Sequence, residues 1–318
     1  MSRERMRDTR ALPWTAPRFA PRFARVAAWA LLLVVLSGQS APAASLLHGE
    51  GLLWRIERPG LAPSYLFGTV HSTDERVRDL PRPVADAIAA TDSLTLEVVI
   101  SDDVEAELAK RMVISDGRLL DEILGLELFA QTATVGARYG IPEVALKLVR
   151  PWAAWMLFSF PPEEIARQAA GEPALDVMLQ ADAMSQNKPV YGLETIDEQI
   201  DVIEGLSENE HIAMLKSTVA ANGEIEDMFE RLIRDYLARD LNAIHAFLSE
   251  QTAGFDAGLA ETITERFIDV RSELMAGRMV PRLAEGNSFI AVGALHLPGE
   301  RGVLHLLELQ GYQIFRVY

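Results

Sequence analysis

The chain has strand-like patterns near both of its ends. In residues 53–57, Trp54 and Ile56 alternate with Leu53 and charged side chains, which predicts a half-buried strand. A Pro-Gly turn follows, so the apolar run at 64–70 should pair with this strand as a hairpin. Further apolar runs predict strands over 92–100, 188–194, 288–294 and 312–318.

Helical patterns fill the middle of the chain. A short helix is expected over 82–90, and the pattern is helical from 102 to about 187. Two capping boxes, Thr195 with Glu198 and Ser207 with Glu210, predict helix starts, the second opening a stretch to about 284. A last helix is expected over 302–310. The sequence therefore predicts an α/β fold, with a central mixed sheet formed by N- and C-terminal strand segments and a large helical insertion.

Two of the predicted strands end in the same way. The run SYLFGTVH meets Gly68 and then His71, and SFIAVGALH meets Gly293 and then His296. A glycine there permits a sharp turn or a close approach, and ligand sites of open α/β sheets lie beyond the carboxyl ends of strands. If the two strands are neighbours, both imidazoles meet at one edge. A third Gly-x-x-His, ending at His305, falls inside a predicted helix and is taken as a chance match.

Two carboxylates have comparable positions. Glu97 interrupts a strand predicted to be buried, where unpaired acids are rare, and Glu194 ends another strand just before a helix. Glu194 could equally serve only to complement that helix dipole, and each histidine alone could be an ordinary core or loop residue. Together, two histidines and two carboxylates suit a divalent ion such as manganese, cobalt, zinc or iron(II).

The first 43 residues have the pattern of a secretory signal. Seven arginines precede residue 26, an uncharged apolar run spans 26–36, and Ala41-Pro42-Ala43 is the expected cleavage site. We therefore expect export to the periplasm or outside the cell, and one domain over 44–318. The alternative is an uncleaved anchor, although the run is about half of the roughly 20 residues that a spanning helix needs.

Composition narrows the function further. The formal net charge is −16, and cleavage would remove seven arginines but only two acids, so nucleic acid is not an expected partner. There is no cysteine, which excludes disulfides and thiolate nucleophiles. No Gly-x-Ser-x-Gly elbow and no His-Glu-x-x-His helix occur, so a serine hydrolase or a common zinc-protease geometry is not expected.

The motifs FGTVH and VGALHLPGERGV, with GEPALDVMLQADAMSQNKPVYGLETIDEQ between them, resemble the TraB/GumN family, which includes the Tiki proteases. The resemblance runs from about residue 52 to 317, and RPW at 150–152 and Gln199 add to it. It implies a fold like that of erythromycin esterases and haem-binding ChaN proteins. It also implies metal-dependent hydrolysis, with site residues His71, Glu97, Glu194 and His296.

The resemblance assigns one further residue. Arg271 stands where the family usually has Arg-Asn, although Ser272 replaces the asparagine here, and the arginine could bind a carboxylate or an oxyanion. The expected function is thus an exported metal-dependent hydrolase, most simply a peptidase acting on a peptide or protein. A hydrolase that uses a histidine base without metal, and a periplasmic accessory or binding protein for haem, metal or polysaccharide, stay open as alternatives.

Overall fold

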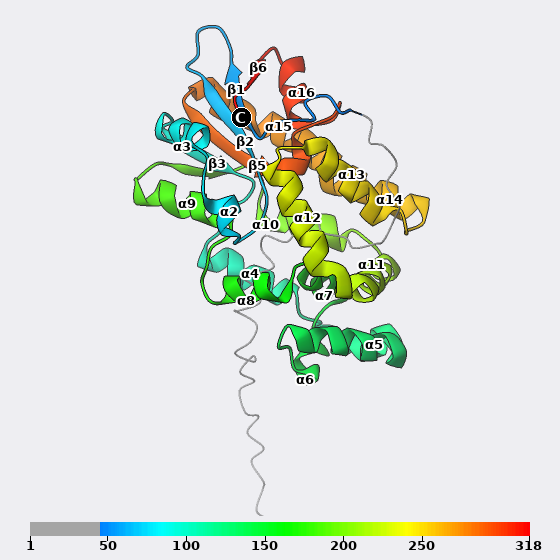
Figure 1. The fold of residues 1–318 in the computed structure, drawn as a ribbon. Coiled ribbons are helices and arrows are strands. Elements are labelled where there is room, and N and C mark those ends of the chain that lie inside the picture. The colour runs from blue at the N-terminus through cyan, green and yellow to red at the C-terminus, as the bar shows by residue number, and fades with distance from the viewer. Residues whose placement is uncertain (1–44) are drawn as a thin grey trace, which may run out of the picture.

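A six-stranded mixed sheet forms the centre of the molecule. The computed structural model describes residues 45–318 (Figure 1). The strand order is β4-β3-β5-β2-β1-β6, with strands β1 Leu53–Glu57, β2 Ser64–Thr69, β3 Ser93–Leu96, β4 Val190–Gly192, β5 Ser288–Gly293 and β6 Gln313–Arg316. The predicted α/β class and the sheet built from both ends of the chain are confirmed.

The strands that carry the two glycine–histidine motifs are neighbours. β2 and β5 run parallel, with Gly68 opposite Val292 and Thr69 opposite Gly293. β3 lies parallel on the other side of β5, so three strands point their carboxyl ends to the same edge. β1 pairs antiparallel with β2 as the predicted hairpin, and β6 pairs antiparallel with β1. The topology therefore brings residues more than 200 positions apart to one edge of the sheet.

The prediction of a buried strand over 188–194 is wrong in extent and burial. β4 has three residues and pairs only with β3 at the border of the sheet. Tyr191 is 36% exposed, and the guanidinium of Arg282 lies 4.1 Å from the centroid of its ring. An edge strand has no neighbour on one side, so its apolar side chains are covered only in part.

Helices occupy the two long connections on either side of β4. The first holds α4 Asp102–Arg111, α5 Leu120–Arg138, α6 Glu143–Leu146, α7 Pro151–Phe158, α8 Pro162–Ala169 and α9 Leu175–Ser185. The second holds α10 Ile196–Glu204, α11 Glu208–Ala221, η1 Asn222–Glu224, α12 Ile225–Leu237, α13 Leu241–Thr252, α14 Ala257–Ile263, η2 Thr264–Asp269 and α15 Val270–Glu285. Shorter elements complete the fold: α2 Glu75–Arg78, α3 Arg82–Ala89, η3 Ala294–His296 and α16 Val303–Leu309.

The helical insertion extends well away from the sheet. Figure 1 shows α5 and α6 at the far end of the molecule, while α12 and α13 lie near the end of the sheet where β2 and β5 stop. All eight residues of α7 are buried, so this aromatic segment packs in the core. No helix among residues 45–318 has the length and apolar content to cross a bilayer. The predicted signal segment 1–43 lies outside the described residues.

The second connection contains an irregular turn. The predicted helical stretch over 207–284 consists of several helices, and Thr264–Asp269 is a π-helix that continues directly into α15. Such segments shift the backbone hydrogen bonds by one residue and are frequent at functional sites. Here the segment ends two residues before Arg271, at the edge of a pocket.

Candidate functional site

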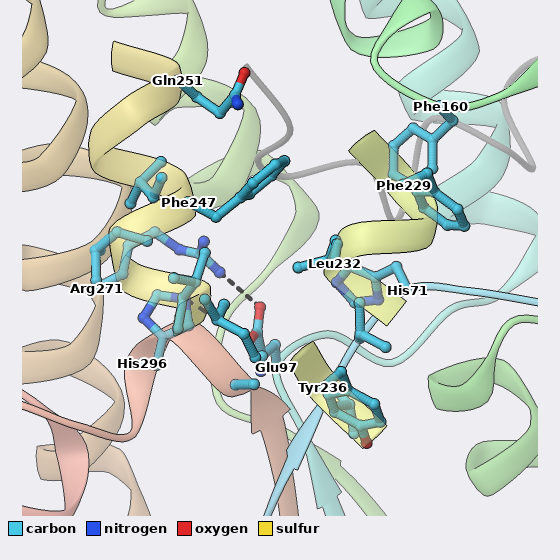
Figure 2. Close-up of a pocket in the computed structure, with 18 residues that line it drawn as sticks. His71, Glu97, Phe160, Phe229, Leu232, Tyr236, Phe247, Gln251, Arg271 and His296 are labelled. Atoms are coloured by element: carbon cyan, nitrogen blue, oxygen red, sulfur yellow. Dashed lines mark hydrogen bonds and ion pairs between the residues drawn. The ribbon is translucent and has the colours of Figure 1, made fainter. Parts of the chain in front are cut away.

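A pocket opens at the carboxyl ends of β2, β3 and β5, and α12, α13 and η2 close its other sides (Figure 2). His71, Glu97, Arg271 and His296 line it together, so four of the five predicted site residues reach one cavity. The fifth, Glu194, is buried behind them and is not among the lining residues. The matched strand ends therefore place both histidines on one pocket.

Glu97 lies between the other polar groups. β3 ends at Leu96, so this carboxylate follows the strand instead of interrupting it. Its Oε1 accepts a hydrogen bond from the backbone N–H of Gly293 at 2.6 Å and lies 3.8 Å from Nε2 of His296. Its Oε2 accepts from Arg271 at 2.7 Å. Burial raises the pKa of Glu97, but Arg271, the two imidazoles and the Gly293 N–H outweigh burial and lower it to about 2.

His296 is held in one orientation by the first turn of α15, which the π-helical segment positions. The hydroxyl of Ser272 donates to the carbonyl of Ile268 at 2.7 Å, and Nδ1 of His296 lies 2.9 Å from the same hydroxyl. Because the hydroxyl proton is used, Nδ1–H of His296 must be the donor, which puts the lone pair of the neutral ring on Nε2, on the side of Glu97. Burial, opposed by Glu97 and assisted by Arg271, lowers the pKa of His296 to about 4. Ser272, which stands in the place of the family's asparagine, thus orients this ring.

His71 is held by a residue that sequence reasoning missed. Its Nδ1 lies 2.7 Å from Oδ2 of Asp176, whose Oδ1 accepts from the Thr69 hydroxyl at 2.6 Å. Burial lowers the pKa of His71, but the charge and hydrogen bond of Asp176 more than offset burial, so the net shift is upward. Asp176 is in the first turn of α9, where an acid reads as an ordinary partner of the helix dipole. Its only distinguishing signal is its near-complete burial, which the sequence does not reveal.

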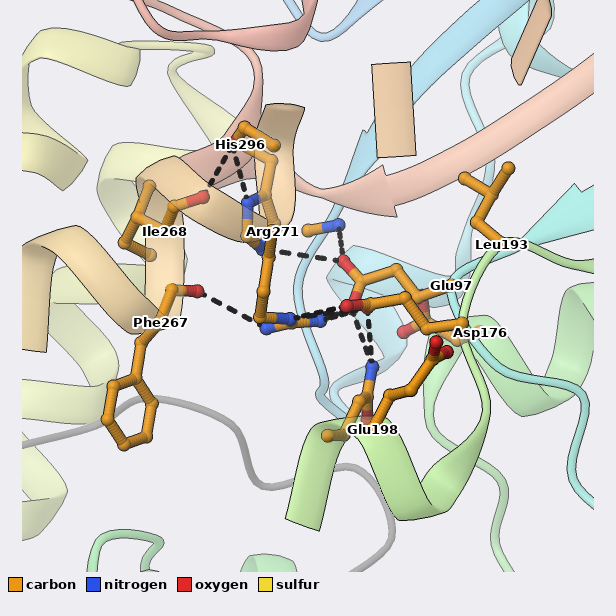
Figure 3. A network of polar contacts seen from close by, with 12 residues as sticks. Glu97, Asp176, Leu193, Glu198, Phe267, Ile268, Arg271 and His296 are labelled. Carbon is orange, nitrogen blue, oxygen red and sulfur yellow. Dashed lines mark hydrogen bonds and ion pairs between the residues drawn. The ribbon is translucent and has the colours of Figure 1, made fainter. Parts of the chain in front are cut away.

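Arg271 joins the two carboxylates (Figure 3). Its Nη2 donates to Oε2 of Glu97 at 2.7 Å and to Oε2 of Glu194 at 2.6 Å, and its Nε donates to Oε1 of Glu194 at 3.0 Å. Gln199 donates to Glu194 as well, at 3.1 Å. Arg271 is 2% exposed, and a buried guanidinium needs such partners to compensate for lost hydration. The structure therefore places Glu194 against the arginine.

The two motif glycines are required by close approaches. A Cβ on Gly68 would meet Cδ1 of Leu297 at 2.7 Å and the backbone of Ala294 at 3.2 Å, so this glycine lets the two strand ends pack together. A Cβ on Gly293 would lie 3.2 Å from Oε1 of Glu97, the oxygen that the Gly293 N–H binds. The second glycine thus admits a carboxylate beside the strand.

The remaining histidines lie elsewhere. His305 is on α16 as predicted, with Nδ1 3.2 Å from Glu308, and does not line the pocket. His245 on α13 hydrogen-bonds through Nε2 to the carbonyl of Leu295 at 2.9 Å, so it supports the loop that carries His296. No local pattern predicts this support, because the two residues are 50 positions apart.

The pocket has metal-binding chemistry without a completed set of ligands. His296 and His71 each engage Nδ1 with a neighbouring group, an arrangement typical of metal-binding histidines, and Glu97 is an ionised carboxylate. As the side chains stand, however, no three His, Asp or Glu groups within 45–318 lie close enough together to hold an ion. Arg271 already binds one oxygen of Glu97. The predicted metal coordination by His71, Glu97, Glu194 and His296 therefore stays a prediction.

Comparisons with known proteins agree with the resemblance. The chain is 26% identical over 313 residues to "Metalloprotease TIKI2" of Danio rerio, which covers 83% of this chain and 60% of the relative. It is 26% identical to "Metalloprotease TIKI1" of Homo sapiens, covering 83% and 61%, and 22% identical to "Metalloprotease TIKI homolog" of Nematostella vectensis, covering 83% and 66%. The chain thus spans about three fifths of the length of the first two relatives.

No solved structure matches the chain, so the likeness to erythromycin esterases and ChaN proteins stays an expectation. The sequence profile of the TraB/PrgY/gumN family matches residues 52–316, a range that holds both motif strands, the helical insertion and every lining residue of the pocket. The chain belongs to the TraB/PrgY/gumN family.

Proposed function

We propose that this protein is an exported metal-dependent peptidase whose active site is the pocket at the ends of β2, β3 and β5. The observation that carries the proposal is the meeting of His71, Glu97 and His296 on one cavity, with His296 and Glu97 3.8 Å apart. The relatives named as metalloproteases support the reaction class. Export rests on the arginine-rich start and the apolar run at 26–36.

The residues divide into two groups. His71, Glu97 and His296 have the donor chemistry for manganese, cobalt or zinc, and such an ion would polarise a carbonyl and acidify a bound water. Arg271 can donate to a substrate carboxylate or to the oxygen that gains charge when a peptide bond is attacked. Glu194, predicted above as a ligand, serves in this proposal to hold Arg271 in place. Hydrolysis consumes one water, breaks the C–N bond and yields a carboxylate and an amine.

The charge states fit this division. With a pKa of about 2, Glu97 is anionic at neutral pH, and with a pKa of about 4, His296 is neutral and keeps its lone pair. Asp176 and the upward shift of His71 favour a proton on that ring, so binding an ion there would displace a proton. An anionic and a neutral donor side by side suit a divalent cation.

The test is metal analysis of protein purified without chelators, followed by cleavage of a peptide library with added manganese, cobalt or zinc. We expect His71→Ala, His296→Ala and Glu97→Gln each to lower hydrolysis at least about 100-fold, since each removes a group with no neighbouring substitute. His305→Ala is the matched control, because this histidine also follows a glycine by three positions and should leave activity near wild type.

Three results would count against the proposal. Full hydrolysis in the presence of a chelator would favour the histidine-base alternative without metal. Loss of activity in His305→Ala with the fold intact would overturn the choice of motifs. A visible absorption band typical of haem, with no cleavage of any peptide, would favour the binding-protein alternative.

A further inference from the structure

The pocket has a second half that the chemistry above does not use. Beyond the polar groups, its wall is made by apolar side chains of the helical insertion. We propose that this half binds a large apolar side chain of the peptide substrate, at the residue next to the bond that is cleaved. The inference rests on the proposed peptidase function and adds the substrate class to it.

The wall is contributed by three separate elements. Phe229 and Leu232 come from α12, Phe247 and Leu248 from α13, and Phe160 from the turn after α7. Each of these side chains is at most 8% exposed. Figure 2 shows Phe247, Phe160 and Phe229 on the side of the pocket opposite Glu97. The pocket therefore has a polar end at the sheet and an apolar end at the helices.

The aromatic wall is preformed. The rings of Phe160 and Phe229 pack at 5.9 Å between centroids, inclined by 59°. The guanidinium of Arg231 lies 5.2 Å from the ring centroid of Phe247, and Arg231 is held in turn by Glu250. Because these rings are fixed by neighbours, a substrate side chain would not have to order them, which lowers the cost of binding.

Charge is confined to one end of the pocket. Apart from one phenol, the charged or titratable side chains that line the pocket lie at the edge of the sheet and are His71, Glu97, Arg271 and His296. The phenol of Tyr236 also lines the pocket, and its hydroxyl donates to the carbonyl of Gly68. At the helical end the polar lining side chain is the amide of Gln251. An aspartate or lysine of a substrate would lose water there without gaining an ionic partner, whereas an aromatic or long aliphatic side chain would gain from burial.

The relative position of the polar and apolar ends of the pocket determines which substrate residue is recognised. A peptide bond placed at Glu97 and Arg271 has the apolar wall directly beside it, because both halves line one cavity. The side chain that enters the wall must therefore belong to a residue flanking that bond. Shape and polarity, instead of paired charges, would select the substrate.

The test uses the full chain and peptides that differ only at the residue beside the cleaved bond, found first by mass spectrometry of library products. We expect kcat/KM for Phe, Leu or Met at this position to exceed that for Ala, Asp or Lys about 100-fold, as hydrophobic pockets allow. Equal cleavage of the Phe and Asp peptides would overturn the inference and leave the peptidase function standing.

A variant that gains activity removes the ambiguity of misfolding. Phe229→Trp fills part of the apolar end, so it should lower kcat/KM for the Phe peptide and raise it for the Ala peptide, shifting the ratio at least about 10-fold. Phe129→Trp is the matched control, since Phe129 on α5 is equally buried at 6% and does not line the pocket. If the ratio of kcat/KM for the Phe peptide to that for the Ala peptide were the same in Phe229→Trp and Phe129→Trp, the apolar wall would not be the binding site for this side chain.

A binding measurement separates this inference from the proposed function. N-acetyl-L-phenylalanine should bind wild type by calorimetry at least about 10-fold more tightly than N-acetyl-L-alanine, and Phe229→Trp should remove the difference. If it binds in this way while no peptide is cleaved, the apolar end is supported and the peptidase proposal fails. If neither amino acid derivative binds and cleavage shows no preference, the apolar subsite is refuted.

Discussion

At the scale of single residues, the site depends on groups that hold the histidines and do not themselves line the pocket. Asp176 holds His71, and Ser272 holds His296. Burial lowers the pKa of both rings, but the charge and hydrogen bond of Asp176 more than offset burial at His71, whereas Glu97 offsets it only in part at His296. The pKa of His71 is therefore raised while that of His296 is lowered to about 4.

Asp176→Asn tests this account. The amide carries no charge, so it no longer attracts a proton to Nδ1, and the pKa of His71 should fall below its wild-type position as burial prevails. The measurement is an NMR titration of the imidazole nitrogens in metal-free protein. His211, whose pKa is lowered by its own burial, is the internal control and should titrate unchanged. If the pKa of His71 were the same in Asp176→Asn and in wild type, the role given to Asp176 would be refuted.

At the scale of elements, the ends of β2 and β5 and the start of α15 determine the site. The two strand ends were predictable, because an apolar run that stops at a glycine is visible in the sequence. The roles of Ser272 and Ile268 were not, because they depend on a π-helical turn whose extra residue leaves no mark in the pattern of apolar positions. The role of Asp176 could not be predicted either, because its burial is produced by segments distant in the sequence and leaves no local pattern.

Alanine substitutions at two glycines test whether a side chain is tolerated at each position, one beside Glu97 and one facing open space. Gly293→Ala places a methyl 3.2 Å from Oε1 of Glu97 and should destabilise the protein by about 1 kcal/mol. Gly277→Ala on α15 meets nothing within 4 Å and should stabilise it by about 0.5–1 kcal/mol, because alanine favours the helix. Urea unfolding measures both, and a stabilised Gly293→Ala variant would contradict the close approach.

At the scale of the whole molecule, the α/β class, the hairpin and the mixed sheet could all be predicted, since periodicity of two separates strands from helices. The strand order could not be derived from periodicity alone, because nothing local tells β3 to pair with β5. The breaks within the helical insertion were also missed. Gly125, at φ 74°, interrupts α5 within a run that otherwise has helical composition.

The buried site makes stability depend on pH. His296 has a pKa of about 4 in the folded chain against 6.5 when exposed, so the unfolded chain binds more protons between these values. Stability should therefore fall as the pH drops from about 6.5 to 4, by about 3 kcal/mol from this group. Glu97, with a folded pKa of about 2 against 4.5, adds a loss below about pH 4.5. His71 acts in the opposite sense, because its pKa is raised, and its contribution is lost as the pH rises.

Urea unfolding of metal-free protein at pH 7 and pH 4.5 measures the effect. In His296→Asn, the amide can still donate to Ser272 but does not take up a proton in this pH range. Most of the fall in the free energy of unfolding between pH 7 and pH 4.5 should therefore disappear. His305→Ala should keep the wild-type dependence. The same pH dependence in His296→Asn and wild type would mean that acid sensitivity comes from other groups.

The position of β5 in the sheet determines when the pocket can form during synthesis of the chain. β5 is the link between β3 with β4 on one side and the β1–β2 hairpin on the other, yet it is made from residues 288–293 of 318. While the ribosome is still making the first 280 residues, neither His296 nor the neighbour that joins the sheet exists. The pocket can therefore assemble only after residues 288–296 have been added to a chain that already holds β2 and β3. A chain that stops before residue 288 lacks both β5 and His296, so it cannot form the pocket, however well its earlier helices fold.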